Sequence, residues 1–161
     1  MRLFLGIKPS KPTLDNIEKW KKSKIQLNVR WTNPDYIHVT IIPPWESDNI
    51  PEATSKISQI QKPGPIKITF NKISLGPNGN QIWLTGESSD NIYKYVSDLQ
   101  SVFSSTNRKF IPHMTLARFK TPQQFETEKI NWPVTFHTLY LIKSTLHPIL
   151  KHEIMQEFPL E

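Results

Sequence analysis

The spacing of hydrophobic residues along the chain alternates between two periods, and each period predicts one kind of element. Ile66, Ile68 and Phe70 alternate with polar residues, which is typical of a strand with one buried face. Between residues 12 and 24, hydrophobic residues instead recur every three or four positions, which is typical of a helix. The pattern predicts strands over 2–8, 27–31, 36–42, 66–75, 81–86, 110–119, 134–144 and 151–158, helices over 12–24, 51–61 and from a cap at 88–90 to 103, one or two helical turns over 122–128, and a polar loop over 104–109.

Proline and glycine residues mark the predicted ends of these elements. Pro43 and Pro44 are expected to end the strand over 36–42, and residues 76–80 are expected to form a hairpin loop. The strands and helices are mixed, with hairpins in place of a regular βαβ alternation. This order predicts an α+β fold in a single domain that covers residues 1–161.

Two short segments repeat one pattern, in which a histidine and a threonine are separated by one hydrophobic residue. The first motif contains His38 and Thr40, and the second contains His113 and Thr115. Residues i and i+2 of a strand project from the same face, so each motif presents an imidazole and a hydroxyl side by side. The repeat indicates an internal duplication whose halves contribute equivalent groups to one site. The alternative is two strands that simply expose these residues to solvent.

The charge balance favours a partner that carries phosphates. The formal net charge is +6 and the pI is about 9.5, although many soluble proteins are as basic without binding nucleic acid. Part of this charge lies at the end of the helix over 12–24, where it interacts favourably with the helix dipole and is expected to be solvated. The residues of that cluster are Lys19, Lys21, Lys22 and Lys24.

The composition excludes several classes of protein and site. The chain has no cysteine, which excludes disulfides, thiolate metal sites and a cysteine nucleophile. The apolar run over residues 3–7 is too short for a signal peptide. No run approaches the roughly 18 apolar residues of a membrane span. We therefore expect a cytoplasmic protein that does not bind membranes.

The two motifs are similar to the signature of the 2H phosphoesterase superfamily. Within it, the chain resembles the RNA 2′,3′-cyclic phosphodiesterase family, also called 2′-5′ RNA ligases. Residues 1–7, the approach through Trp31 and Pro34, and residues 110–118 are also similar to that family, whereas residues 42–46 depart from its usual Phe-Leu-Gly stretch. The resemblance implies two pseudo-symmetric lobes of antiparallel sheet, with helices on the outside, around a central cleft that receives one motif from each lobe.

Two histidines with ordinary pKa values can act as an acid and a base near neutral pH. Entering and leaving oxygens of a phosphoryl group lie roughly in line, so one imidazole on each side fits the reaction. The resemblance implies that the chain opens RNA 2′,3′-cyclic phosphate ends to 2′-phosphates, with His113 activating water and His38 protonating the 3′-oxygen; the reverse reaction would exchange these roles. Thr40 and Thr115 can donate hydrogen bonds to phosphate oxygens. The resemblance adds Arg118 as a phosphate ligand.

Arg118 lies an odd number of positions after the second histidine, so strict alternation places it on the opposite face of the strand. It reaches the phosphate only if the strand bulges or bends, and the alternative is a surface or ion-paired arginine. Four aromatic residues flank the motifs and could stack on a base or fill the core: Trp31, Tyr36, Trp45 and Phe110. The remaining histidines lack a threonine two positions later and are expected to be structural or exposed: His137, His147 and His152.

No metal or other cofactor is expected. His152 and Glu153 do not continue into a zinc motif, because Gln156 occupies the position of its second histidine. No Walker-type glycine-rich loop is present, which fits a reaction independent of ATP. The expected partner is an RNA or oligonucleotide with a cyclic phosphate end, bound by a monomer. The alternatives are a 2H enzyme for another phosphodiester (a 2′-5′ linkage, a nucleotide cyclic phosphate, or ATP-independent 2′-5′ ligation) and a non-catalytic module that binds RNA ends.

Overall fold

The computed structural model of the chain describes residues 1–103 and 108–161. The helices are α1 (Lys11–Lys22), α2 (Ile50–Ser58) and α3 (Asp90–Phe103), and a short 3₁₀ helix, η1, spans Pro34–Tyr36. The strands are β1 (Arg2–Ile7), β2 (Val29–Trp31), β3 (Val39–Glu46), β4 (Ile66–Leu75), β5 (Gln81–Ser88), β6 (His113–Phe119), β7 (Glu128–Phe136), β8 (Thr138–Thr145) and β9 (Lys151–Pro159). Within the described residues, no helix is long and apolar enough to cross a membrane. Most of the polar loop predicted over 104–109 lies outside the described residues.

The strands form one antiparallel sheet that has two halves. Its order is β7-β4-β5-β6-β3-β1-β8-β9, with β2 paired to β6. We call β7, β4, β5, β6 and β2 the β6 half, and β3, β1, β8 and β9 the β3 half. In the described part of the chain, the halves are joined by one residue pair, Val39 opposite Met114. The predicted α+β fold is confirmed, and each half carries one motif strand.

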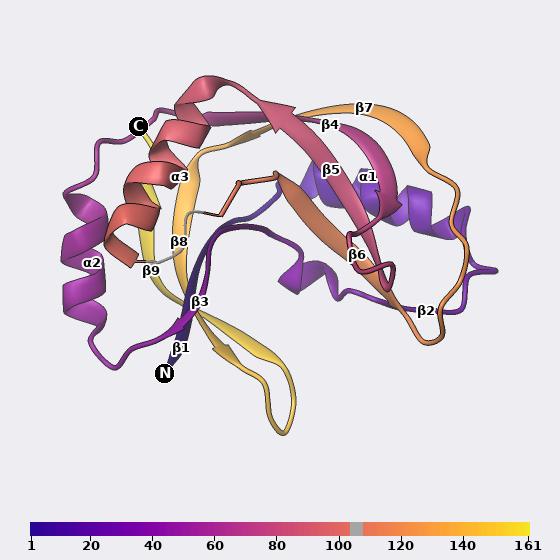
Figure 1. Ribbon diagram of the computed structural model, residues 1–161, viewed down its shortest axis with the longest axis horizontal. Coiled ribbons are helices and arrows are strands. Elements are labelled where there is room, and N and C mark those ends of the chain that lie inside the picture. The colour runs from indigo at the N-terminus through magenta and orange to yellow at the C-terminus, as the bar shows by residue number, and fades with distance from the viewer. Residues whose placement is uncertain (104–107) are drawn as a thin grey trace.

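Helices α1 and α3 each follow a strand of one half but pack against the other half. Helix α1 follows β1 and precedes β3, yet the indole N–H of Trp20 in α1 donates to Glu128 of β7 over 2.8 Å. Helix α3 connects β5 to β6, yet the Phe103 ring packs against Trp45 of β3 with their centroids 4.8 Å apart. In Figure 1, α1 accordingly lies beside β4 and β5, while α3 lies on the side of β3 and β8.

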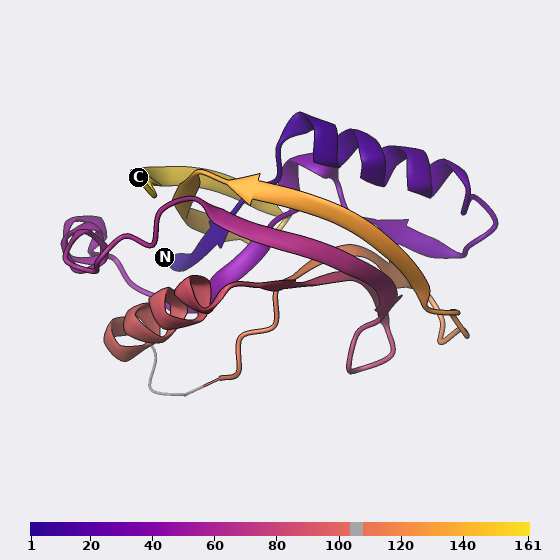
Figure 2. The ribbon, with the colours of Figure 1, turned by 90° about the horizontal axis from the view of Figure 1, so that it is seen from above.

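The buried faces follow the hydrophobic pattern of the sequence. In β4, Ile66, Ile68 and Phe70 are buried and the residues between them are exposed. Strand β1 is central in its half and is buried over residues 3–7. Ile17 of α1 is buried as part of the same core. Figure 2 shows α1 over one face of the β6 half, while no described helix covers the opposite face, which we call the open face.

Pro43 and Pro44 do not end the first motif strand, so this prediction is wrong. Strand β3 continues through both prolines to Glu46. Its ladder with β1 shifts register between Leu3 and Leu5, and the two prolines lie across from this irregular stretch. A bulge leaves strand positions without ladder hydrogen bonds, and proline, which lacks an N–H, is tolerated there.

The chain after the second motif strand also differs from the prediction. Residues 122–127 are irregular rather than helical. The predicted strand over 134–144 is instead two strands, β7 and β8, with His137 between them. Strand β7 begins at Glu128 and includes Pro133, because β7 lies at the edge of the sheet, where a missing N–H is tolerated.

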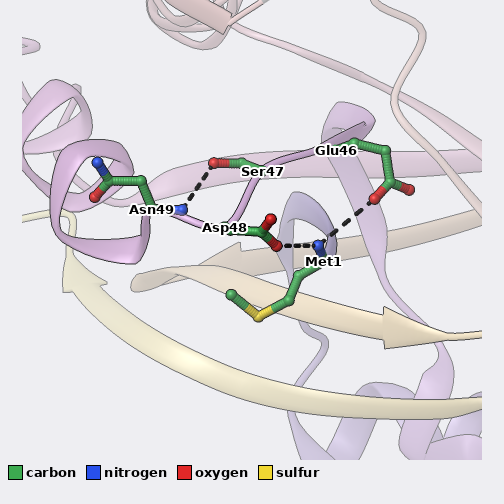
Figure 3. Close-up of polar contacts among 5 residues, drawn as sticks. All are labelled: Met1, Glu46, Ser47, Asp48 and Asn49. Atoms are coloured by element: carbon green, nitrogen blue, oxygen red, sulfur yellow. Dashed lines mark hydrogen bonds and ion pairs between the residues drawn. The ribbon is translucent and has the colours of Figure 1, made fainter.

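Met1 is tied to the segment that follows β3. Its α-amino group donates to Asp48 Oδ1 over 2.7 Å and lies 3.6 Å from a Glu46 carboxylate oxygen (Figure 3). Its bond to Asp48 raises the pKa of the amino group and lowers that of the carboxyl group. The N–H of Asn49 donates to Ser47 Oγ in the same turn. Solvent screens these contacts, so we expect them to position the segment more than to stabilise the fold.

Candidate active site

The two motifs meet where the halves of the sheet join. Val39 and Met114, the middle residues of the motifs, lie opposite each other in antiparallel strands. Extending this register by one residue on each side places the histidine of each motif across from the threonine of the other. Residues directly opposite each other project from the same face of a sheet. The structure therefore brings the two imidazoles and the two hydroxyls together on one face of the junction.

Both motif strands begin later than predicted, at or just after their histidine. His38 follows η1 and immediately precedes β3, and His113 is the first residue of β6. In each case the Nδ1 atom lies against the carbonyl oxygen two residues earlier, at 2.7 Å from Tyr36 and 2.8 Å from Ile111. A carbonyl oxygen only accepts, so Nδ1 carries the proton and Nε2 is the basic atom of each neutral ring.

The two threonines have different neighbours on the shared face. The Oγ1 atom of Thr40 lies 3.0 Å from His38 Nε2, so this hydroxyl donates to the neutral imidazole. Thr115 lies across from Trp83 of β5. Both threonines are half-buried, and each hydroxyl can donate to an oxygen of a bound phosphate.

An aromatic ring covers each imidazole. Trp83 stacks on His113 with the ring centroids 3.6 Å apart and the planes 13° from parallel. The indole N–H of Trp83 donates to Gln81 Oε1 over 2.8 Å, which holds the stacked ring in place. Phe4 lies against His38 with a centroid separation of 4.8 Å. These rings shield both imidazoles from water and limit their rotation.

Burial lowers the pKa of both motif histidines. For His38, burial is the largest cause, the charges of Lys8 and His113 add to it, and the hydrogen bond to Tyr36 opposes it. For His113, burial is opposed by the hydrogen bond to Ile111. Both rings are therefore neutral near pH 7, and a proton on His113 disfavours protonation of His38. An anionic phosphate beside them would favour their protonated forms.

A bulge in β6 places Arg118 on the face of the second motif. Thr115 pairs with Trp83 and Arg118 pairs with Gln81, which leaves one extra residue in β6. Trp83 and Gln81 are two positions apart in β5 and share a face, so Arg118 lies on the same face as Thr115. The bulge thus meets the condition under which this exposed arginine can reach a phosphate at the motif.

Among the four aromatic candidates, Tyr36 lies beside the histidines, whereas the other three pack elsewhere. Its ring lies 4.7 Å from that of His152, and its hydroxyl donates to the Leu150 carbonyl over 3.1 Å. The partners of the others are Trp20 for Trp31, Phe103 for Trp45 and Tyr93 for Phe110. Base stacking by these three would therefore compete with packing contacts.

Three residues at the site were not predicted from the sequence: Phe4, Trp83 and His152. The His152 ring lies 5.7 Å from that of His38, and both line a cavity of about 420 Å³. Burial, with neighbouring positive charges, lowers the pKa of His152 to about 4. Trp83 could have been noticed as a tryptophan at a polar-face position of its strand. No local signal marks Phe4 or His152, because β1 and β9 bring them together from opposite ends of the chain.

The other two histidines lie away from this site. His137 is exposed and lies 3.0 Å from Glu161, and His147 is exposed in the turn between β8 and β9. Both match the expectation of a structural or exposed histidine. Within residues 1–103 and 108–161, no group of three histidine, cysteine or acidic side chains could hold a metal ion.

The comparisons with known proteins identify a family. The model of the 2′-5′ RNA ligase superfamily matches residues 9–147. No curated protein matches the chain.

Solved structures share the fold across almost the whole chain. TT0787 of Thermus thermophilus has a TM-score of 0.83 at 17% identity, and the match covers 99% of this chain and 98% of TT0787. E. coli LigT, solved with 3′-AMP, has a TM-score of 0.80 at 17% identity over 98% of this chain and 97% of LigT. The MHV ns2 PDE domain has a TM-score of 0.61 at 16% identity over 88% of this chain and 98% of that domain. At these identities the likeness shows the fold, and it confirms the predicted architecture.

Proposed function

Because the chain belongs to the 2′-5′ RNA ligase superfamily, we propose that it is a metal-independent phosphodiesterase that opens RNA 2′,3′-cyclic phosphate ends to 2′-phosphates. The observation that carries this proposal is the matched pair of imidazoles at the junction of the sheet. Each Nδ1–H is bound to a backbone carbonyl, so Nε2 is the atom of each ring that can exchange a proton, and in His38 this atom accepts a hydrogen bond from Thr40. Two such groups on either side of a phosphorus atom are what an in-line displacement needs.

In the proposed reaction, one imidazole acts as the base and the other as the acid. Nε2 of His113 takes a proton from water as its oxygen bonds to phosphorus, and the bond from phosphorus to the 3′-oxygen breaks. His38, in its protonated form, gives its proton to that 3′-oxygen, which leaves a 2′-phosphate and a free 3′-hydroxyl. Thr40, Thr115 and Arg118 stabilise the charge on the non-bridging oxygens. The direction of proton flow rests on the family resemblance.

The related structures support a ligand of nucleotide type. E. coli LigT has been solved with 3′-AMP and with NADP⁺. A phosphate flanked by a nucleoside is the element shared by these ligands and by an RNA end. A 5′-hydroxyl in place of water would turn the same chemistry into 2′-5′ ligation, so the test must detect both products.

The test is turnover of a short RNA that ends in a 2′,3′-cyclic phosphate, with EDTA present. We expect hydrolysis to a 2′-phosphate, and a loss of several orders of magnitude in kcat for His38→Ala or His113→Ala. Because both act in one transition state, the double variant should lose little more than either single variant.

Three outcomes would contradict this proposal. Additive losses for the two single variants would argue against a shared site. Binding of the cyclic end without product would indicate a module that recognises RNA ends. Turnover restricted to 2′-5′ linked RNA, to a nucleotide cyclic phosphate or to end joining would indicate another phosphodiester as substrate.

We further propose that the protein acts as a monomer in the cytoplasm. The absence of cysteine supports a reducing compartment, and the two motifs already complete one site within one chain. Light scattering at assay concentrations should give the mass of one chain, and a stable dimer would contradict this.

A further inference from the structure

A row of residues crosses the open face of the β6 half, perpendicular to its strands. His113 pairs with Thr85 of β5, Thr85 with Lys72 of β4, and Lys72 with Lys129 of β7. Paired residues project from the same face, so the two lysines lie on the face that carries the catalytic histidine. Neighbouring strands are about 4.8 Å apart, so the Lys72 backbone lies about 10 Å from that of His113, and Lys129 about 14 Å.

A second basic row lies beside the first. Arg30 of β2 pairs with Arg118, which pairs with Gln81 of β5. Both rows thus hold like charges directly opposite each other, Lys72 with Lys129 and Arg30 with Arg118. Such pairs destabilise a sheet unless a counter-charge is present.

These four cations have no carboxylate partner among the described residues. All four side chains are exposed, and no ion pair in the described part of the chain includes any of them. On this face, Glu87 of β5 lies opposite Thr69, two positions along β5 from Thr85 and diagonal to Lys72, but it forms no ion pair with that lysine. The opposite face is the one that α1 covers (Figure 2). The open face is therefore a basic surface that begins at the candidate active site.

We propose that this face binds the backbone of single-stranded RNA, with Lys72 and Lys129 contacting phosphates of the segment that leads away from the reacting end. This inference rests on the proposed function for the identity of the reacting end. A sheet face with unpaired cations and few acids fits a polyanion. Phosphates that bind there would supply the counter-charge that both like-charge pairs lack.

The chain offers a matched pair of variants for the test. Lys72→Gln/Lys129→Gln removes two charges from the open face. Lys19→Gln/Lys22→Gln removes two exposed charges from α1, on the covered side. Neither double variant touches the motifs, and loss of a like-charge pair should not impair folding.

Binding is measured by fluorescence anisotropy with a labelled single-stranded oligoribonucleotide of about ten nucleotides that ends in free hydroxyls. We expect Lys72→Gln/Lys129→Gln to weaken binding by roughly 10-fold or more near about 0.1 M salt, and to reduce the salt slope by about 1.4. We expect Lys19→Gln/Lys22→Gln to change neither quantity. Equal losses of affinity in both double variants would show an effect of net charge alone and would overturn the proposal. Unchanged affinity in Lys72→Gln/Lys129→Gln would also overturn it.

Turnover assays distinguish a failure of this surface proposal from a failure of the proposed function. With a nucleoside 2′,3′-cyclic phosphate, which is too short to reach Lys72, both double variants should keep the native kcat/KM. With a cyclic-phosphate oligonucleotide, KM should rise about 10-fold in Lys72→Gln/Lys129→Gln alone. An unchanged KM would show that the substrate chain does not cross this row. If no cyclic phosphate is turned over by the native protein, the proposed function fails, while the anisotropy result still decides the surface.

Discussion

The two motif histidines share the same backbone hydrogen bond and the same direction of pKa shift, but they differ in neighbours. His113 lies under Trp83, whereas His38 contacts both Phe4 and His152, which also contact each other. Each set of neighbours removes water from a ring without giving it a negative partner. The resulting neutral imidazoles are good proton acceptors. The histidine that acts as the acid therefore needs the negative charge of the substrate phosphate to stabilise its protonated form.

The pH dependence of turnover should reflect these lowered pKa values. One imidazole must be neutral and the other protonated, so kcat/KM should be bell-shaped with pH. Because burial lowers the pKa of both groups below 6.5, the optimum should lie on the acid side of that value. The measurement is kcat/KM on a cyclic-phosphate substrate between about pH 4 and 9. A flat profile would contradict the pairing.

Trp83→Ala tests whether the stacked indole causes the lowered pKa of His113. Without the stacked indole, His113 is more exposed and its pKa should rise toward its ordinary value. One limb of the bell should then move to higher pH while the other stays. A profile that does not move would show that the stack does not set this pKa.

His152 should make stability depend on pH. Its pKa is about 4 in the folded chain and near 6.5 when unfolded, so the unfolded state binds the proton first as pH falls. The free energy of unfolding should be highest above pH 6.5 and decrease between about pH 6.5 and 4. In His152→Phe, which keeps a ring against Phe4 and Tyr36, the urea midpoint should fall less over this range. The exposed variant His137→Asn should behave like the native chain, and an unchanged pH dependence in His152→Phe would be contrary to this.

At the scale of elements, bulges determine which side chains reach the site. The extra residue in β6 turns Arg118 to the face of the motif. The irregular ladder between β1 and β3 accommodates two prolines within a strand. In both cases the partner strand selects the register, and the local sequence does not specify it.

Arg118→Gln should weaken phosphate binding. A charged hydrogen bond to an anion contributes about 1.5–3 kcal/mol, so kcat/KM on a cyclic phosphate should fall roughly 10- to 150-fold. The side chain is exposed, and its loss also relieves the repulsion of Arg30, so the melting temperature should not fall. Lys120→Gln, which removes an exposed charge just beyond β6, is the matched control. Equal activity of Arg118→Gln and the native chain would exclude the arginine from the site.

A structural feature could be predicted from the sequence where it depends on its own residues, and could not where distant strands determine it. The alternation of Ile66, Ile68 and Phe70 predicts β4 over the range that the structure shows, because a half-buried strand depends on its own residues. The two motifs were predictable as a pair for the same reason. The pairing of β7 at the sheet edge and the approach of His152 to His38 depend on distant strands, so no local pattern could predict them.

At the scale of the whole molecule, helices α1 and α3 add contacts between the two halves to the single described pair of the sheet. The ladder between the halves holds one described pair, Val39 with Met114, whereas α1 and α3 each pack across the junction. The Lys24 ammonium lies 2.9 Å from the Glu128 carboxylate, which also accepts from the Trp20 indole. These contacts support the proposal that residues 1–161 form one domain.

Trp20→Ala tests this coupling. Loss of the partly buried ring and its hydrogen bond should lower the free energy of unfolding by about 2–3 kcal/mol. Because α1 joins both halves, circular dichroism and tryptophan fluorescence should still report one coincident transition in urea. Two separate transitions, in the native chain or the variant, would mean that the halves are independent domains.

The packing of α1 and α3 on opposite halves also constrains how such a chain could have arisen. A single strand–helix–strand unit, cut from this fold, would leave its helix without the sheet on which it packs. Two copies of that unit could cover their sheets only by exchanging helices, as in a domain-swapped dimer. A chain that arose in this way would be a covalent version of a symmetric pair, with the twofold axis of the ancestor between Val39 and Met114. Each ancestral protomer would have supplied one histidine, so catalysis would have depended on dimerisation before the two genes fused.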